Sequence, residues 1–268
     1  NKLHEVEDLP RPENIKECKI LDTKIENLEG YLFKALEYEE KEGNFWHLLY
    51  TVKETGEKLE LATTRPETML GDTAVAINGD DPRYAHLHGC HVILPLLNKE
   101  IPIVCDEHAD MTKGTGVVKI TPAHDPNDFE VGLRHNLPIV RTFTYDGHMT
   151  GAKDKAVADE IFASGRATQN EPEVLDCGKY AGTTTLEARK AIVADLEAGG
   201  YIKEIEPLKH DVGTCYRCHS TIEPMVSKQW FVKMDPLAGP AIDAVENGDI
   251  KFVPERFKKN YMSWMRGT

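Results

Sequence analysis

The chain lacks any hydrophobic run that could cross a bilayer. Its longer apolar stretches, such as HVILPLL at residues 91–97, are far shorter than the ~20 apolar residues that a membrane-spanning helix requires. It also lacks a basic start followed by an apolar stretch, the mark of a secretory signal peptide. We therefore expect a cytoplasmic protein with no membrane partner.

Cysteine and basic residues are scarce. Six cysteines among 268 residues are too few for a disulfide scaffold and favour a reducing compartment. The 32 lysines and arginines are outnumbered by 45 acidic residues, so the net charge is −13. This balance argues against a general coat on duplex DNA, whose binding depends on neutralising phosphates, but it permits a local basic face. Apolar residues make up 40% of the chain, which is enough to fill a packed core.

The order of the predicted elements indicates a β-rich α/β protein. Short apolar runs separated by turn formers predict strands in the first half of the chain. Many short strands spaced in this way favour a curled, barrel-like sheet, which we expect to be surrounded by helices and followed by a small C-terminal connector. The predicted strands cover residues 45–52, 59–64, 73–78, 91–97, 101–106, 117–121 and 139–145.

Helical periodicity begins later in the chain. Asp154 is a plausible N-cap for a helix over 154–165, and a second helix is predicted over 185–200. Two further helix-like stretches cover residues 236–246 and 254–266. The residues expected along one face of the second helix are Leu186, Ala188, Ile192, Val193 and Leu196.

The segment TTRPETMLGD at 63–72 gathers hydrogen-bonding side chains directly after a predicted strand. One interpretation is a strand end capped by threonines, with Arg65 paired to Glu67 or Asp72. The other is the wall of a small polar pocket, to which Thr63, Thr64 and Arg65 would contribute.

A second cluster, GTGVVKITPAHDPNDFEVG at 114–132, combines a buried strand with a helix start. Lys119 and Thr121 fall on the same face of the strand, because side chains alternate with a period of two. Asp125 is expected at the N-cap, followed by Pro126 at N1 and Asp128 at N3. A helix cap alone explains the Asp and Pro, but a cation, a hydroxyl and two acids within one turn can also hold a zwitterionic amino acid.

These two segments resemble the editing domain of valyl-tRNA synthetases, an insertion in class I aminoacyl-tRNA synthetases. The match rests on TTRPETMLGDTAVAIN at 63–78 and on GTGVVKITPAHDPNDFEVGLRHNLP at 114–138. Isoleucyl and leucyl relatives share the threonine-rich strand and the Gly-x-Gly…HD pattern, but PAHDPNDFEVG is most similar to the valyl branch. Flanking stretches at 38–57, 178–197 and 223–261 extend the resemblance to about residues 35–268.

The resemblance implies a domain division and also an incomplete enzyme. Residues 1–34 match poorly, 35–206 form the editing domain, 207–235 a degenerate zinc-ribbon-like connector and 236–268 a helical connector. No HIGH-type or KMSKS-type sequence is present. We therefore expect the nucleotide-activating domain to be missing, with no aminoacylation by this chain. No cofactor is expected for editing, since ATP and magnesium belong to the missing domain.

The implied activity is hydrolysis of the ester bond of misacylated tRNA, chiefly threonine on tRNA(Val), with the tRNA CCA end and the rest of the synthetase as partners. Asp125 resembles the anchor for the α-ammonium, Lys119 and Thr121 resemble substrate contacts in the reaction centre, and Asp128 resembles the group that recognises the threonine hydroxyl. The remaining substrate-binding candidates are Thr63, Thr64 and Arg65 on the opposite wall and His124, which could order a water or simply be a satisfied histidine.

Two alternatives stay open. The chain could be an isoleucyl-type editing domain that clears valine from tRNA(Ile), or a tRNA-binding module without catalysis.

Two C-terminal features are ambiguous. Cys215 and Cys218 have zinc-knuckle spacing, but no second Cys-x-x-Cys pair is present, so we expect no bound metal. Residues 250–268 interleave basic and aromatic side chains, which suits either a solvated amphipathic helix or contact with tRNA.

Overall fold

The computed structural model describes residues 36–165, 167, 171–227 and 234–267. These residues belong to two compact units that divide between residues 227 and 228. The poorly matched segment predicted at 1–34 lies outside the described residues. No helix within the described ranges is long and apolar enough to span a membrane.

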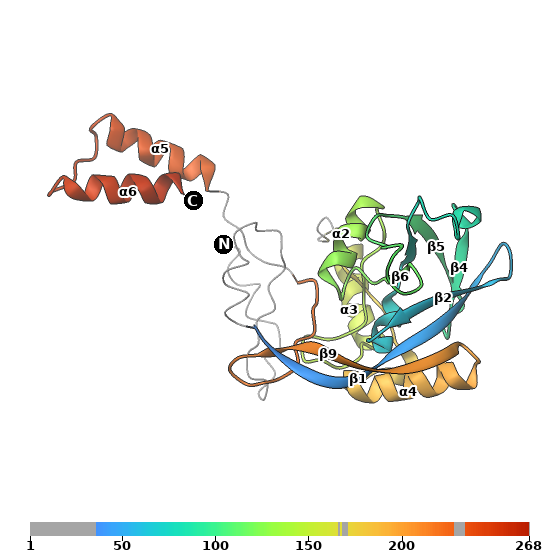
Figure 1. The fold of residues 1–268 in the computed structure, drawn as a ribbon. Coiled ribbons are helices and arrows are strands. Elements are labelled where there is room, and N and C mark those ends of the chain that lie inside the picture. The colour runs from blue at the N-terminus through green and yellow to red at the C-terminus, as the bar shows by residue number, and fades with distance from the viewer. Residues whose placement is uncertain (1–35, 166, 168–170, 228–233, 268) are drawn as a thin grey trace. The chain divides into compact units, whose positions relative to one another are not determined.

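A mixed seven-stranded sheet dominates the described part of the first unit (Figure 1). Its strands follow the order β2-β1-β4-β5-β3-β6, and β9 pairs with β1 beside this path. Only β3 and β5 are parallel among these pairs. The strands at the two ends of the path, β2 and β6, lie against each other, so the sheet is nearly closed into a barrel. The predicted β-rich α/β fold is confirmed. The strands are β1 (Leu36–Val52), β2 (Lys58–Thr63), β3 (Ala74–Ile77), β4 (His91–Leu94), β5 (Lys99–Cys105), β6 (Val117–Ile120) and β9 (Ile202–Cys215).

Helices and a small second sheet surround this barrel-like sheet (Figure 1). The second sheet is the parallel pair of β7 (Val140–Arg141) and β8 (Glu173–Val174). The α-helices of this unit are α2 (Pro126–Arg134), α3 (Ala152–Ala163) and α4 (Thr185–Ala198), and the short 3₁₀ helices are η2 (Pro66–Gly71), η3 (Ala85–Leu87) and η4 (Gly178–Tyr180).

The two helices predicted from periodicity, at 154–165 and 185–200, are present, each with one local correction. Helix α3 is capped by Gly151 rather than by Asp154, because the Asp154 carboxylate sits at N3 and accepts the Gly151 N–H at 2.9 Å. Helix α4 buries Ala188, Ile192 and Leu196 at a spacing of four. Leu186 is 63% exposed instead of buried, since residues two apart point to nearly opposite sides of a helix.

The close approach of α2 to the sheet sets the position of the candidate site. Strand β3 is buried on both faces: Val75 and Ile77 join the main core, whereas Ala74 and Ala76 pack in a second cluster with Val131 of α2. The alanine face lets the helix come close. Gly132 has the same effect, because a β-carbon there would lie 2.9 Å from Cγ of Pro122. The start of α2 is thereby held beside the end of β6.

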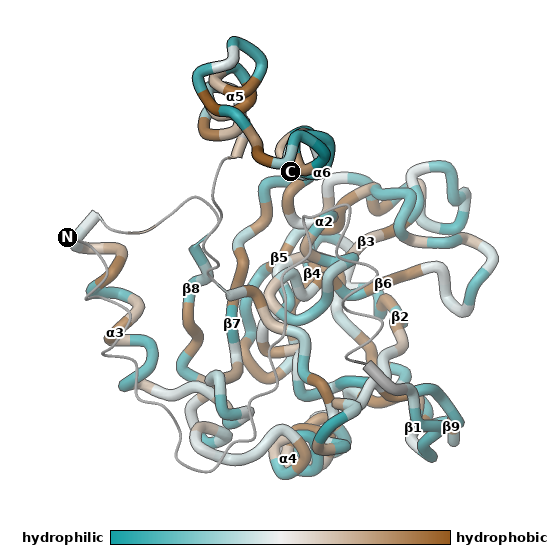
Figure 2. Tube along the Cα trace, turned by 90° about the vertical axis from the view of Figure 1, so that its left-hand side faces the viewer, coloured by the Kyte–Doolittle hydropathy of each residue, from teal (hydrophilic) through white to brown (hydrophobic). Residues whose placement is uncertain are grey.

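Strand β9 forms a long ribbon with β1 and is itself mostly exposed or half-buried. The end of this ribbon that is labelled in Figure 2 is hydrophilic. The domain boundary expected between residues 206 and 207 lies inside β9, since backbone pairing with β1 continues to Cys215. After Cys215 the chain turns tightly, with the N–H of His219 donating to the Cys215 carbonyl at 2.8 Å. Among the described residues, no group of three or more His, Cys, Asp or Glu side chains is placed to hold a metal.

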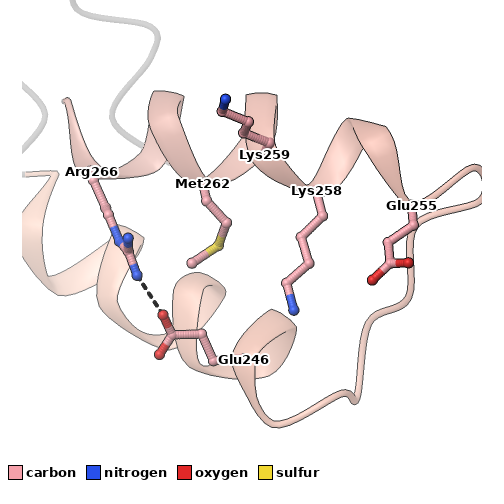
Figure 3. A pocket seen from close by; sticks show the side chains of 6 residues that line it. All are labelled: Glu246, Glu255, Lys258, Lys259, Met262 and Arg266. Carbon is pink, nitrogen blue, oxygen red and sulfur yellow. Dashed lines mark hydrogen bonds and ion pairs between the residues drawn. The ribbon is translucent and has the colours of Figure 1, made fainter.

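The second unit contains two helices within its described part, α5 (Asp235–Glu246) and α6 (Arg256–Arg266), in agreement with the predicted helical stretches. Val245 of α5 and Met262 of α6 are buried. Figure 3 shows Met262 and Arg266 on the side of α6 that faces α5, where Arg266 donates to Glu246 at 2.5 Å.

The buried pair between Glu67 of η2 and Arg189 of α4 provides a test of the fold. Glu67 is fully buried and accepts two hydrogen bonds from Arg189, at 2.7 and 2.8 Å. Arg189→Met leaves the Glu67 carboxylate buried with only the longer contact to Arg65, at 3.6 Å. We therefore expect a loss of ~3 kcal/mol in the free energy of unfolding, measured by urea denaturation. Lys155→Met, which breaks an exposed pair on α3, should change it little. Equal effects of the two substitutions would contradict this role for Arg189.

Candidate functional site

The threonine-rich strand end forms one wall of a hollow in the first unit. Pro66 occupies the first turn of η2 after Arg65, and every residue of η2 is buried. Thr63 Oγ1 accepts the Arg65 N–H at 3.1 Å, and Thr68 Oγ1 donates to the Arg65 carbonyl at 2.9 Å. The threonines therefore cap the strand end as expected, and the same backbone turn places their side chains beside β6.

A buried network joins this wall to β6. Lys119 Nζ donates to Thr121 Oγ1 at 2.5 Å and to Thr68 Oγ1 at 2.9 Å, and lies 3.4 Å from Asp72 Oδ1. Thr121 Oγ1 donates to the same Asp72 oxygen at 2.6 Å, and the Tyr50 hydroxyl donates to Asp72 Oδ2 at 2.8 Å. Lys119 and Thr121 thus share a face of the strand, as their spacing predicts. Tyr50, Thr68 and Asp72 complete the network from other elements.

Asp72 is the least conventional member of this network. Burial raises its pKa to about 6, although Lys119, Thr121 and Tyr50 all favour the charged carboxylate. The side chain of its partner Lys119 is 11% exposed. The ammonium can therefore face the hollow while it keeps its contact with Asp72.

The two acids at the start of α2 form the facing wall. Asp125 is the N-cap, Pro126 is in the first turn and Asp128 is at N3, which confirms the predicted helix start. Asp125 Oδ1 accepts the N–H groups of Asn127 at 2.8 Å and Asp128 at 3.2 Å. Within the described residues these bonds leave Oδ2 without a hydrogen-bond partner. Burial, and then the neighbouring Asp128 carboxylate, raise the pKa of Asp125.

Asp128 is more deeply placed and is 6% exposed. Its Oδ2 accepts the N–H of Thr121 at 2.9 Å, which connects α2 to the end of β6. Its Oδ1 lies 3.6 Å from Nε2 of His108.

His124 has a structural position. It is 1% exposed, Nε2 accepts the Thr142 N–H at 2.9 Å, and Nδ1 lies 3.4 Å from the Pro224 carbonyl. Burial lowers its pKa to about 3, so the ring is neutral. Both ring nitrogens are therefore engaged within the protein in this structure. His124 resembles the satisfied histidine that the sequence left open, and a substrate contact through it stays a prediction.

Arg65 is also engaged within the protein. Nη1 donates to the His124 carbonyl at 3.2 Å, Nη2 bonds to Glu223, and Nε lies 3.6 Å from Glu67. The pairing with Glu67 that the sequence suggested is therefore present, whereas Asp72 pairs with Lys119 instead.

These walls enclose a hollow of about 250 Å³. This is smaller than the ~300–1,000 Å³ of typical small-molecule sites and suits a group of amino-acid size. The structure brings all eight predicted site residues together around it; their chemical roles stay predictions. They are Thr63, Thr64, Arg65, Lys119, Thr121, His124, Asp125 and Asp128, and the lining is completed by Phe45, Ala62, Thr68, His108, Val118 and Asn127.

Asp72 and His108 were not among the predicted residues of the candidate site. Asp72 belongs to the recognised TTRPETMLGD segment, so its polarity was a usable signal, but its buried contact with Lys119 was not. His108 lies in the loop after β5 and belongs to no recognised motif.

A further hollow of about 470 Å³ lies in the second unit between α5 and α6 (Figure 3). This hollow is lined mainly by charged side chains. Trp264, also on α6, is 79% exposed. An amphipathic helix, one of the two interpretations of residues 250–268, is present as α6. Contact of this surface with tRNA stays a prediction.

Comparison with protein families identifies the class of protein to which this chain belongs. A family model described as class I tRNA synthetases (I, L, M and V) matches residues 13–268, and the chain belongs to this family.

Within the family, the chain is similar to valine–tRNA ligases. It is 52% identical to that of Clostridium perfringens over 230 residues, 86% of this chain and 23% of the relative. It is 48% identical to that of Carboxydothermus hydrogenoformans over 248 residues, 92% of this chain and 25% of the relative. The predicted resemblance to valyl-tRNA synthetases is confirmed. The chain spans about a quarter of the length of the curated relatives that it matches.

The raised pKa of Asp72 predicts a specific pH dependence of stability. Its pKa is about 6 in the folded chain and ~3.9 in an unfolded one. The folded state therefore binds more protons between these values, and this contribution to stability is lost as the pH rises through the folded pKa. The free energy of unfolding of the wild type minus that of Asp72→Asn should fall between about pH 4 and about pH 7.

Urea unfolding at several pH values measures this difference, with Asp159→Asn on exposed α3 as the control. A difference that rises with pH would contradict the raised pKa of Asp72, because it would mean that the attraction of Lys119 lowers this pKa more than burial raises it.

Proposed function

We propose that this chain hydrolyses the ester bond of misacylated tRNA, chiefly threonine attached to tRNA(Val). The similarity to valine–tRNA ligases supports tRNA as the substrate. The hollow between β2, β6 and α2 supports hydrolysis of a small aminoacyl ester. The observation that carries the proposal is the convergence of Lys119, Asp125 and Asp128 on one cavity of amino-acid size.

The need for such a reaction follows from the shape of valine. A hydrophobic pocket that accepts valine cannot strongly reject threonine, which is nearly isosteric and adds a hydroxyl; valine-specific synthetases are the standard example of this limit. A second pocket can require the hydroxyl instead, since a polar group that is left unpaired by valine makes valine binding unfavourable.

The walls of the hollow offer matching partners. Asp125, whose Oδ2 is unoccupied by the described residues, would bind the α-ammonium of the aminoacyl group. Asp128 would accept the threonine hydroxyl, and Lys119 would face the ester carbonyl or a ribose oxygen. Thr63, Thr64 and Arg65 would contact the substrate from the opposite wall.

The proposed chemistry needs only a positioned water, assisted by the free hydroxyl of the terminal ribose. The water oxygen attacks the ester carbon, the bond from that carbon to the ribose oxygen breaks, and the ribose oxygen takes up a proton. The products are threonine and uncharged tRNA. Orientation of the ester against the water would supply much of the acceleration.

Deacylation of three separate substrates tests the proposal: Thr-tRNA(Val), Val-tRNA(Val) and Val-tRNA(Ile). We expect release of threonine with little release of valine. Selective release of valine from tRNA(Ile) would indicate an isoleucyl-type editor, and no release from any substrate would leave a tRNA-binding module.

Asp125 provides a variant that separates charge from capping. Asp125→Asn keeps an oxygen that can accept the N–H groups of Asn127 and Asp128, so stability should be retained, whereas Asp125→Ala should also lose the ~1 kcal/mol of an N-cap. Both variants should lose most Thr-tRNA deacylation, because neither keeps a negative partner for the ammonium. Full activity of Asp125→Asn would contradict the anchoring role.

Asp128 should instead control selectivity. A hydrogen bond to a charged group contributes ~1.5–3 kcal/mol, so Asp128→Asn should lower the preference for threonine over valine by roughly 10–100-fold. The ratio of kcat/KM for Thr-tRNA(Val) and Val-tRNA(Val) measures this change, with Asp159→Asn as the control. An unchanged ratio would show that another group recognises the hydroxyl.

A further inference from the structure

His108 reaches the candidate site from outside the two recognised segments. It lies in the loop between β5 and β6, lines the hollow and is 28% exposed at its side chain. Its Nε2 is 3.6 Å from Oδ1 of Asp128, within ion-pair distance.

The backbone that carries His108 is anchored to the helix that carries Asp128. Asp106 Oδ1 accepts the His108 N–H at 2.9 Å. The same carboxylate accepts bonds from Arg134 at 2.8 and 3.0 Å and from His135 at 2.9 Å, at the C-terminal end of α2. These partners hold the pKa of Asp106 well below its usual range. The loop and the helix therefore form one connected support for the two facing side chains.

The two oxygens of Asp128 are constrained from opposite sides. Oδ2 accepts the Thr121 N–H at 2.9 Å, and Oδ1 faces His108. One hydrogen bond leaves the carboxylate some freedom to turn about its Cβ–Cγ bond. A contact at the second oxygen restricts this torsion.

We propose that His108 is a positioning residue that orients Asp128, so that Oδ1 presents a free acceptor direction to a hydroxyl on the substrate side chain. This inference rests on the proposed function and adds a residue that controls its specificity. His108 acts through Asp128 and need not touch the substrate.

The charges around His108 agree with this role. The Asp128 carboxylate raises the pKa of His108, and the carboxylates of Asp125 and Asp106 act in the same direction. Asp106 is already paired with Arg134 and His135. Removal of the Asp128 carboxylate should therefore lower the pKa of His108 more than removal of either other carboxylate.

NMR titration of the histidine rings tests the contact without any substrate. His108→Gln identifies the His108 signal by its loss. The pKa of His108 should lie above the ~6.5 of an ordinary histidine and should fall in Asp128→Asn. His86, an exposed histidine that pairs with Glu57, provides the control position for the substitutions below. An unchanged His108 pKa in Asp128→Asn would overturn the proposal.

Deacylation by the full chain tests the consequence. His108→Leu removes the donor and should lower the preference for Thr-tRNA(Val) over Val-tRNA(Val) by about tenfold, as expected when a charge-assisted contact is lost. His108→Gln keeps a donor near the position of Nε2 and should restore most of the preference. His86→Leu is the matched control.

The outcomes separate the two proposals. An unchanged preference in His108→Leu, or equal losses in the Leu and Gln variants, would overturn the positioning role. A wild-type chain that releases no threonine would contradict the proposed function alone, and the NMR titration would still decide whether His108 holds Asp128.

Discussion

The buried contact between Asp72 and Lys119 is the constraint on which the site depends. A charge without a partner inside a protein costs several kcal/mol, so Asp72 requires the donors that surround it. Those donors come from separate elements: Tyr50 from β1, Lys119 from β6 and Thr121 directly after it. Satisfying one carboxylate therefore links β1 to β6, and both strands supply residues that line the hollow.

Packing also positions the second wall, together with the hydrogen bond from the Thr121 N–H to Asp128. Small side chains on one face of β3, and Gly132 on α2, allow the helix to approach the sheet closely. The start of α2 then projects Asp125 and Asp128 across from Lys119 and the threonines. The two walls are therefore held in place before a ligand binds, which is what the proposed selective binding of a small aminoacyl group would require.

Much of this could be predicted from local sequence. The start of α2 was predicted residue by residue, because an N-cap depends on neighbours within three positions. Where local rules competed, prediction was less exact. Asp154 satisfies the rules for both N-cap and N3, and only the backbone path shows that it is at N3. The expected boundary at 206/207 follows a change in composition, but it does not interrupt the pairing of β9 with β1.

By itself, the sequence determined the positions of strands β2 to β6, the cap of α2, the family resemblance and the two segments that supply eight candidate site residues. Each of these depends on residues close together in the chain. Only the tertiary structure decided which side chains share an environment. Curling of the sheet brings Tyr50 to Asp72 and the loop after β5 brings His108 to Asp128. Contacts of this kind depend on strand register and helix packing, which no local pattern encodes.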